Sequence, residues 1–143
     1  MKFFVASDHA GLRVKKKALD FLSSSSVKFE DLSPDNHGGD DYPDFAFLVA
    51  KKVFEKKKFG LLVCGSGIGM SIAANKQKGV RAALCRTPKD AELSRAHNNA
   101  NILVLSGSTK SKDVGLILSK FISTPFDKGR HLRRVRKISG FEK

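Results

Sequence analysis

The sequence predicts a single doubly wound, Rossmann-like α/β domain in which helices cover both faces of a five-stranded parallel sheet. Apolar runs of strand length alternate with amphipathic helical patterns from one end of the chain to the other. Strands that are each followed by a helix form a parallel sheet, because the crossovers are right-handed. A chain of 143 residues is long enough to bury roughly two-thirds of its unfolded surface, so residues 1–143 are expected to form one domain.

The first part of the chain begins this alternation. Lys2–Ser7 is an apolar run of strand length, and Leu12–Ser23 then places apolar residues at helical spacing. Val27–Leu32 is the second predicted strand, and the polar, glycine-bearing stretch 33–41 predicts a loop. Pro43 favours a helix start, and apolar residues spaced three and four apart follow it.

The middle of the chain repeats the pattern. Phe59–Cys64 is the third predicted strand, a helix is expected from about residue 69 to 76, and Val80–Cys85 is the fourth strand. Thr87-Pro88 forms a capped entry to the next helix, which is expected to end near His97.

The last part completes the sheet and adds a helix. Ile102–Leu105 is the fifth predicted strand, and residues 114–122 supply the apolar face of a helix that Pro125 ends. A basic carboxyl-terminal helix is expected after Gly129.

The chain is strongly basic, with 27 Lys and Arg residues against 14 Asp and Glu and a formal net charge of +13. Its lysine clusters at 15–17, 51–52 and 56–58 fall on the polar sides of separate segments, without interleaved aromatic residues for stacking on bases. Most of these lysines are interpreted as solvated faces. Nonspecific polyanion binding is a side property of this charge, and no specific nucleic-acid partner is expected.

The two cysteines, Cys64 and Cys85, lie far apart and have no C-x-x-C or zinc-ligand spacing. The short apolar start of the chain ends at Ser7, before it reaches the length of a signal peptide or a membrane span. We therefore expect a reduced, cytoplasmic protein with no targeting segment, no membrane partner and no metal.

A thiol stands where the third predicted strand meets a glycine-rich turn, in Cys64-Gly65-Ser66-Gly67-Ile68-Gly69. Alternating glycines let the backbone turn sharply and bring its N–H groups close to a ligand, and a helix start adds positive potential. This arrangement suits an oxyanion held beside Cys64, and its field favours the thiolate. The spacing differs from the pattern G-x-G-x-x-G, so a nicotinamide cofactor is not expected. The alternative is that Cys64 is a small buried hydrophobe beside an ordinary turn.

Further polar residues collect at the ends of predicted elements. Asp8 and His9 follow the first strand, at the sheet edge where doubly wound domains bind ligands, and Arg86 follows the fourth. The Asp-His pair can move protons or hold a phosphate, but a helix cap with a solvated neighbour explains it equally well. His97 also suits the carboxyl terminus of its helix, and Tyr42 fits either a site or a hydrophobic staple.

The basic tail places Arg130 and Arg134 four residues apart, on one face of the predicted last helix. Two guanidinium groups so spaced can grip one phosphate. Leu132, Val135 and Ile138 lie on another face, which indicates packing against a further surface such as a second subunit. The alternative is a solvated basic tail.

Taken together, these motifs resemble the B-type ribose-5-phosphate isomerases in order and spacing over nearly the whole chain. The matching segments are Asp8-His9-Ala10-Gly11, Asp41-Tyr42-Pro43-Asp44, residues 64–69 with 73–76, residues 95–101, and Gly129-Arg130-His131 with Arg134-Val135. The same superfamily includes galactose-6-phosphate and allose-6-phosphate isomerases. The joint presence of His9, Cys64 and His97 favours the pentose enzymes.

The resemblance implies interconversion of ribose 5-phosphate and ribulose 5-phosphate through an enediolate, without metal or organic cofactor, in the pentose phosphate pathway. Cys64 would be the base that moves a proton between carbons 1 and 2, and Ser66 would help to shuttle the hydroxyl proton. The turn would hold the enediolate through the backbone of Gly65, Gly67, Ile68 and Gly69.

The resemblance also assigns the remaining site residues and the assembly. The implied roles are ring opening by His97 with Asp8, phosphate binding by His9, Arg130 and Arg134, and contacts to the sugar by Tyr42 and Asn98. Members of the family form homodimers or homotetramers with sites at the subunit interface, so some of these groups would act across it.

One position departs from the family pattern, and two other functions stay open. The turn after the fifth strand usually carries a phosphate-binding arginine where this chain has Ser108, and Lys110 is the candidate replacement as a point charge. The first alternative function is the same chemistry on a six-carbon sugar phosphate, allose 6-phosphate or galactose 6-phosphate. The second is a non-catalytic basic module that binds RNA or another polyanion.

Overall fold

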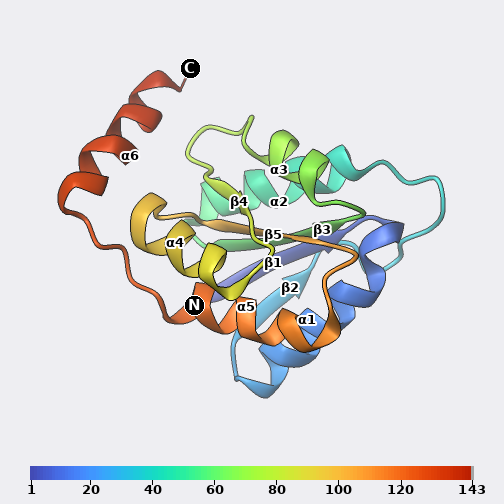
Figure 1. The fold of residues 1–143 in the computed structure, drawn as a ribbon. Coiled ribbons are helices and arrows are strands. Elements are labelled where there is room, and N and C mark those ends of the chain that lie inside the picture. Colours follow the sequence, from blue (N-terminus) through green and yellow to red (C-terminus); the bar gives the residue numbers. More distant parts are fainter. Residues whose placement is uncertain (143) are drawn as a thin grey trace.

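The computed structural model describes residues 1–142, and in them a parallel sheet runs in the order β2-β1-β3-β5-β4 (Figure 1). The strands are β1 (Lys2–Ser7), β2 (Lys28–Asp31), β3 (Phe59–Cys64), β4 (Ala82–Leu84) and β5 (Ile102–Ser106). The predicted doubly wound α/β fold is confirmed. All neighbouring strands are parallel, so their carboxyl ends share one edge of the sheet.

Helices cover both faces of this sheet (Figure 1). They are α1 (Leu12–Ser24), α2 (Tyr42–Lys56), α3 (Ile68–Ala74), α4 (Pro88–Asn98), α5 (Ser111–Ser123) and α6 (Gly129–Phe141). In the part of the chain that the structure describes, no helix is both long and apolar enough to cross a membrane. The layer of α1, α4 and α5 lies on one face, and α2 with α3 lies on the other.

The central strand β3 shows how the sheet separates two hydrophobic clusters. Leu61 and Val63 point into the cluster under α1, α4 and α5, whereas Leu62 and Cys64 point into the cluster under α2 and α3. Because side chains alternate along a strand, an apolar run buries both of its faces. This is why β3 reads as a continuous apolar segment in the sequence.

The strands predicted at Val27–Leu32 and Val80–Cys85 are shorter in the structure, and one short helical turn was not predicted. The strand predicted at Val80–Cys85 is the three-residue edge strand β4, because Val80 N donates to Gln77 O and Arg81 N donates to Asn101 Oδ1 instead of joining the ladder. A 3₁₀ turn at His9–Gly11 (η1) precedes α1.

The interpretation of the first lysine cluster was wrong at Lys15. Its side chain is buried, and its ammonium group donates to Ser33 O at 2.6 Å and Asn36 Oδ1 at 3.1 Å, and pairs with Asp31 Oδ2 at 3.2 Å. The position after Val14 on α1 faces the loop that follows β2, and the polar atoms of this loop fill the coordination of the buried cation. Lys15 therefore fastens the loop to α1.

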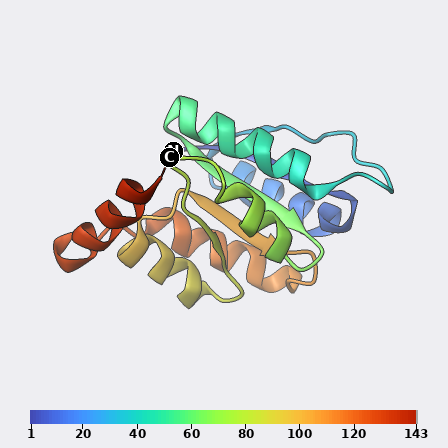
Figure 2. The same ribbon diagram turned by 90° about the horizontal axis from the view of Figure 1, so that it is seen from above.

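Helix α6 stands apart from the body of the domain in both views (Figures 1 and 2). It lies on the side of the amino ends of the strands. His131 and Val135 are its buried residues, while Ile138 and Phe141 expose 48% and 87% of their surface. The sequence-based expectation that this helix has an inward face thus holds at Val135, while Ile138 is uncovered.

We expect Lys15→Ala to lower the free energy of unfolding by about 2–4 kcal/mol, because it leaves buried acceptors of Lys15 without their cation. Lys16→Ala, which removes an exposed lysine from the same helix, should change it by less than about 0.5 kcal/mol. Urea denaturation of both variants measures the difference. Equal stability of the two would show that Lys15 contributes no more than a surface lysine.

Candidate active site

The register of the sheet brings three chain segments together at its carboxyl edge. Ser7 pairs with Val63, and Cys64 pairs with Ser106. Asp8 N donates to Val63 O at 3.2 Å, and Gly107 N donates to Cys64 O at 2.7 Å. The ends of β1, β3 and β5 are thereby locked to one another by backbone hydrogen bonds.

Cys64 ends β3 as a nearly buried thiol, with 4% of its surface exposed. The turn that follows passes through Gly67 in the left-handed region at φ +79°. A Cβ atom on Gly67 would lie 2.5 Å from Leu84 Cδ1 and 3.1 Å from Leu105 O. Glycine is therefore required there both by conformation and by space. Ser66 Oγ accepts a hydrogen bond from Ile68 N at 3.2 Å, which holds the entry of α3.

Asp8 lies beside this turn and caps the η1 turn. Its carboxylate accepts hydrogen bonds from Ala10 N at 3.0 Å and Gly11 N at 3.1 Å, so the alternative of a cap is correct for its local structure. Burial raises the pKa of Asp8, against the opposing effects of the His9 charge and the two backbone donors. A carboxyl group of raised pKa is suited to exchanging protons.

His9 is held by an acidic partner that sequence reasoning missed. Its Nδ1 atom is hydrogen bonded to Asp40 Oδ1, and its backbone N–H donates to the same oxygen at 3.0 Å. The hydrogen bond to Asp40 raises the pKa of His9. The imidazole is thereby biased toward its cationic form, which suits contact with a phosphate.

Asp40 is fixed in turn by the loop after β2. Burial alone would raise its pKa, but hydrogen bonds from the His9 side chain, the His9 backbone, Asn36 and His37 outweigh burial and lower it. Asn36 Nδ2 donates to Asp40 Oδ2 at 3.1 Å, and Asn36 Oδ1 accepts from Lys15. A chain of polar contacts thus runs from Lys15 to His9. The one indication of Asp40 in the sequence was the acid-rich loop that follows β2, the strand adjacent to β1.

Tyr42 reaches the same place from the start of α2. It is 39% exposed, and its ring covers Gly69, where an added Cβ would lie 2.7 Å from the phenol oxygen. Any side chain at Gly69 would displace this ring. Tyr42 is therefore positioned over the glycine-rich turn.

A polar cavity of about 200 Å³ adjoins the turn after β5, lined by Arg86, Ser106, Ser108, Thr109, Lys110 and Asp113. Ser106 Oγ donates to Gly65 O at 2.8 Å and lies 2.7 Å from Ser108 Oγ. Lys110, the predicted replacement for the arginine, does line this cavity, and so does Arg86, which the sequence analysis noted at the sheet edge without assigning it to the site.

Arg13 is a second residue that sequence reasoning missed. Its guanidinium donates to Gly107 O at 3.0 Å, Thr109 O at 2.7 Å and Ser111 Oγ at 2.8 Å. It thereby fixes the loop between β5 and α5. No motif in the sequence signalled this role, because the partners are backbone carbonyls far along the chain.

The other predicted site residues lie at the opposite edge of the sheet. His97 and Asn98 form the last turn of α4, and Arg81 Nε donates to Asn98 O at 3.1 Å just before β4 begins. Gly60 pairs with Ile102, whereas Cys64 pairs with Ser106, so these edges are separated by about 13 Å of strand. One chain does not bring His97 to Cys64.

Arg130 and Arg134 also lie at the amino edge of the sheet, on the exposed side of α6. The His97 and His131 rings are stacked at a centroid distance of 4.2 Å and an interplanar angle of 7°. Burial, and then the charge of His97, lower the pKa of His131. The stack joins α6 to the end of α4, and so groups both arginines with His97.

Two clusters in the described residues have metal-ligand composition: Asp8 with His9 and Asp40, and His97 with Asp127 and His131. In the first, Asp8 accepts from backbone N–H groups and Asp40 is bonded to His9 Nδ1. In the second, the parallel stack keeps the in-plane lone pairs of the two imidazoles from converging on one ion. The geometry of neither cluster favours a metal.

We expect Asp40→Asn to lower the pKa of His9 toward its ordinary value, because the charged acceptor of its Nδ1–H is lost. NMR titration of the His9 ring measures this pKa. Asp35→Asn, which removes an equal charge from an exposed position in the same loop, should leave it unchanged. A His9 pKa that is the same in the Asp40 variant as in the unmodified protein would contradict the pairing.

The chain is similar to known proteins over nearly its whole length. A family model described as Ribose/Galactose Isomerase matches residues 3–138. The chain is 46% identical to the probable ribose-5-phosphate isomerase B of Mycoplasma genitalium, covering 98% of this chain and 95% of that protein. It is 37% identical to ribose-5-phosphate isomerase B of Escherichia coli, covering 99% of this chain and 96% of that one.

Solved structures give the same result. The M. genitalium enzyme with bound ribulose-5-phosphate superimposes with a TM-score of 0.94 and 44% identity, over 99% of this chain and 95% of that one. Ribose 5-phosphate isomerase of Thermotoga maritima gives a TM-score of 0.93 and 46% identity, over 97% of each chain. The match of sequence and fold shows that this chain belongs to the ribose/galactose isomerase family.

Proposed function

We propose that this protein is an aldose–ketose isomerase that interconverts ribose 5-phosphate and ribulose 5-phosphate. The observation that carries this function is its near full-length likeness to the M. genitalium structure with bound ribulose-5-phosphate. The edge of the sheet supplies what the chemistry needs. Proton transfer next to a carbonyl requires a placed base and donors for the enediolate, and Cys64 stands directly before a glycine-rich turn.

In the proposed reaction, Cys64 removes a proton from the carbon next to the carbonyl and returns it to the neighbouring carbon. The backbone N–H groups of residues 65–69 stabilise the oxyanion of the enediolate, and Ser66 passes the hydroxyl proton. Tyr42, which covers Gly69, lines the sugar together with Asn98. No step requires a metal ion or an organic cofactor.

Ring opening and phosphate binding are assigned to groups from both edges of the sheet. His97, with Asp8 as its proton-exchanging partner, opens the furanose ring, and His9, Arg130 and Arg134 bind the phosphate. Since His97 and both arginines lie at the edge remote from Cys64, we infer a homodimer, alone or within a tetramer, in which each site combines the carboxyl edge of one subunit with α4 and α6 of the other.

The uncovered apolar side chains support this assembly. Ile68 and Ile72 on α3 expose 49% and 58% of their surface, and Ile138 and Phe141 on α6 are exposed as well. An interface that buries α3 of one subunit near α6 of another would cover them. It would also deliver Arg130 and Arg134 to the turn that precedes α3.

The relatives favour a five-carbon substrate over the alternatives. Those of Mycoplasma and Escherichia coli are named for ribose 5-phosphate, so neither an isomerase of six-carbon sugar phosphates nor an RNA-binding module is proposed. The reaction is a step of the pentose phosphate pathway. Both cysteines are free, which supports a reducing, cytoplasmic location.

We expect Cys64→Ser to lower turnover by roughly two orders of magnitude or more, because a serine hydroxyl, unlike a thiol, does not ionise to a basic anion near neutral pH. The Michaelis constant and the fold should change little. Cys85→Ser is the matched control, since burial raises the pKa of Cys85 to about 12 and keeps that thiol inert. Near-normal turnover of the Cys64 variant would remove the thiol from the mechanism and leave Asp8 as the candidate base.

The phosphate contacts are tested by Arg134→Ala and Lys110→Ala. Each removes a charge-assisted contact worth about 1.5–3 kcal/mol, so the Michaelis constant for ribose 5-phosphate should rise about tenfold or more. Lys112→Ala, an exposed lysine just beyond the cavity, should leave it unchanged. If the Michaelis constant of Lys110→Ala is as unchanged as that of Lys112→Ala, Lys110 does not take the role of the family's arginine at the position of Ser108.

A further inference from the structure

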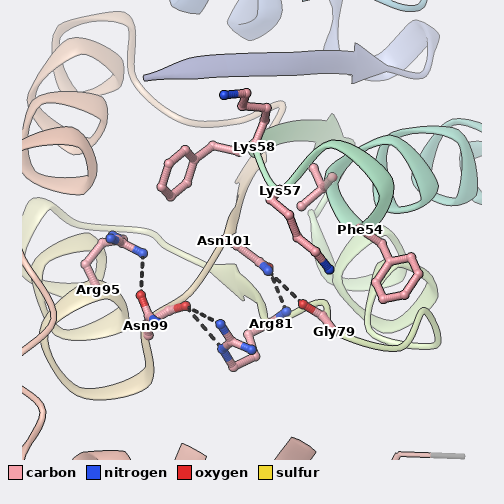
Figure 3. A pocket seen from close by; sticks show the side chains of 10 residues that line it. Phe54, Lys57, Lys58, Gly79, Arg81, Arg95, Asn99 and Asn101 are labelled. Carbon is pink, nitrogen blue, oxygen red and sulfur yellow. Dashed lines mark hydrogen bonds between the residues drawn. The ribbon is translucent and has the colours of Figure 1, made fainter.

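We propose that the protein has a second anion site, which binds a small phosphate-bearing ligand at the amino edge of the sheet (Figure 3), in a cavity that none of the residues assigned to the active site lines. The site is a cavity of about 210 Å³, lined by Val53, Phe54, Lys57, Lys58, Phe59, Gly79, Arg81, Arg95, Asn99 and Asn101. Four of these residues are cationic and none is acidic.

Three connections build this cavity where strands begin. Lys57 and Lys58 join α2 to β3, Arg81 precedes β4, and Arg95 approaches from the last turns of α4. Cys64 lies at the far end of β3, about 17 Å of strand away from Phe59. The cavity therefore shares no lining residue with the glycine-rich turn.

Arg95 is the feature that points to a ligand. Its side chain is 8% exposed, and its Nη1 atom donates to Asn99 Oδ1 at 3.0 Å and Ala100 O at 2.6 Å. Its Nε atom is buried and has no hydrogen-bond acceptor among the described residues. A buried guanidinium with an unused donor and no counter-charge is costly unless an anion compensates it.

Aromatic contacts hold this guanidinium in place without neutralising it. Its central carbon lies 5.1 Å from the ring centroid of Phe59 and 5.6 Å from that of Phe121. Burial, and then the charge of Arg81, lower the pKa of Arg95. The positive charge is therefore held in position by these rings, and the charge of Arg81 has the same sign.

Arg81 is fixed beside it by backbone carbonyls. Its Nε donates to Asn98 O at 3.1 Å. Its Nε and Nη2 donate to Asn99 O at 3.1 and 3.0 Å (Figure 3). The carboxylate whose charge reaches Arg81 belongs to Glu142, which accepts a hydrogen bond from Gly79 N at 3.0 Å and does not line the cavity. No ion pair involves any of the four cations within residues 1–142.

Two exposed lysines also line the cavity. Lys57 extends over the Phe54 ring, with its ammonium nitrogen 4.4 Å from the centroid, and Lys58 is the next residue along the chain. Long lysine side chains can close on a bound anion as point charges. The set of two guanidiniums held by hydrogen bonds and two exposed lysines suits a phosphate dianion better than a monocarboxylate.

The size and lining of the cavity limit the rest of the ligand. A volume of 210 Å³ corresponds to about seven water molecules, which is enough for a phosphate and a few further atoms. Phe54, Phe59 and Val53 give an apolar wall on one side. Inorganic phosphate and a small phosphate monoester share the chemistry that this site recognises.

The test is an NMR titration of the ¹⁵N-labelled full chain with inorganic phosphate, at ionic strength kept constant with sodium chloride. We expect saturable shifts of the amides of residues 57–60 and 79–82, distinct in midpoint from those of residues 65–69. A parallel titration with glycerol 2-phosphate distinguishes a phosphate monoester from inorganic phosphate as the ligand. Saturation at a lower concentration of the ester identifies an ester as the ligand. Saturation at an equal or higher concentration identifies free phosphate.

Charge-matched variants complete the test. The double variant Lys57→Ala/Lys58→Ala should weaken the phosphate affinity of this segment about tenfold or more, while Lys16→Ala/Lys17→Ala, which removes the same charge from the exposed side of α1, should leave it unchanged. Absence of saturable shifts at residues 57–60 and 79–82 would overturn the proposal. Equal weakening by the two double variants would also overturn it, since diffuse charge would then explain the binding.

Discussion

The parallel register of β1, β3 and β5 is the constraint on which the candidate site depends. It aligns Ser7 with Val63 and Cys64 with Ser106, so the turns after these strands meet at one edge. The turns then pack so closely that glycine is required where they touch. A Cβ on Gly11 would lie 2.7 Å from Val63 O, and one on Gly107 would lie 3.3 Å from Cys64 O. The thiol, the capped Asp8 and the glycine-rich turn are positioned by the sheet itself.

The same register separates the chemistry of one chain into two parts. The groups proposed for proton transfer lie at the carboxyl edge, whereas His97 and the arginines of α6 lie at the amino edge, joined by the stack of His97 on His131. A rigid sheet cannot bring its two edges together. The proposed assembly of two copies would resolve this, because a two-fold axis would place the amino-edge groups of each subunit against the carboxyl edge of the other.

The sequence predicts the fold and the carboxyl-edge residues well, because both follow from local patterns. The apolar runs locate the strands, and the end of a parallel strand marks the edge where Asp8 and Cys64 stand. Residues whose role depends on distant partners were missed or misread. Asp40 binds His9, and Lys15 is buried by the loop of Ser33 and Asn36, and neither contact is visible in spacing along the chain. The distance between His97 and Cys64 likewise became apparent only from the strand register.

The central claim is that each active site combines groups of two subunits, and mixing of two inactive variants tests it directly. Cys64→Ser and His97→Ala proteins are each expected to be nearly inactive. If the site is shared, unfolding and refolding them together should restore about a quarter of the unmodified activity, because half of the random dimers carry one intact site of two. Activity of the mixture no higher than that of the separate variants would contradict the shared site, and would require Cys64 and His97 of the same chain to meet.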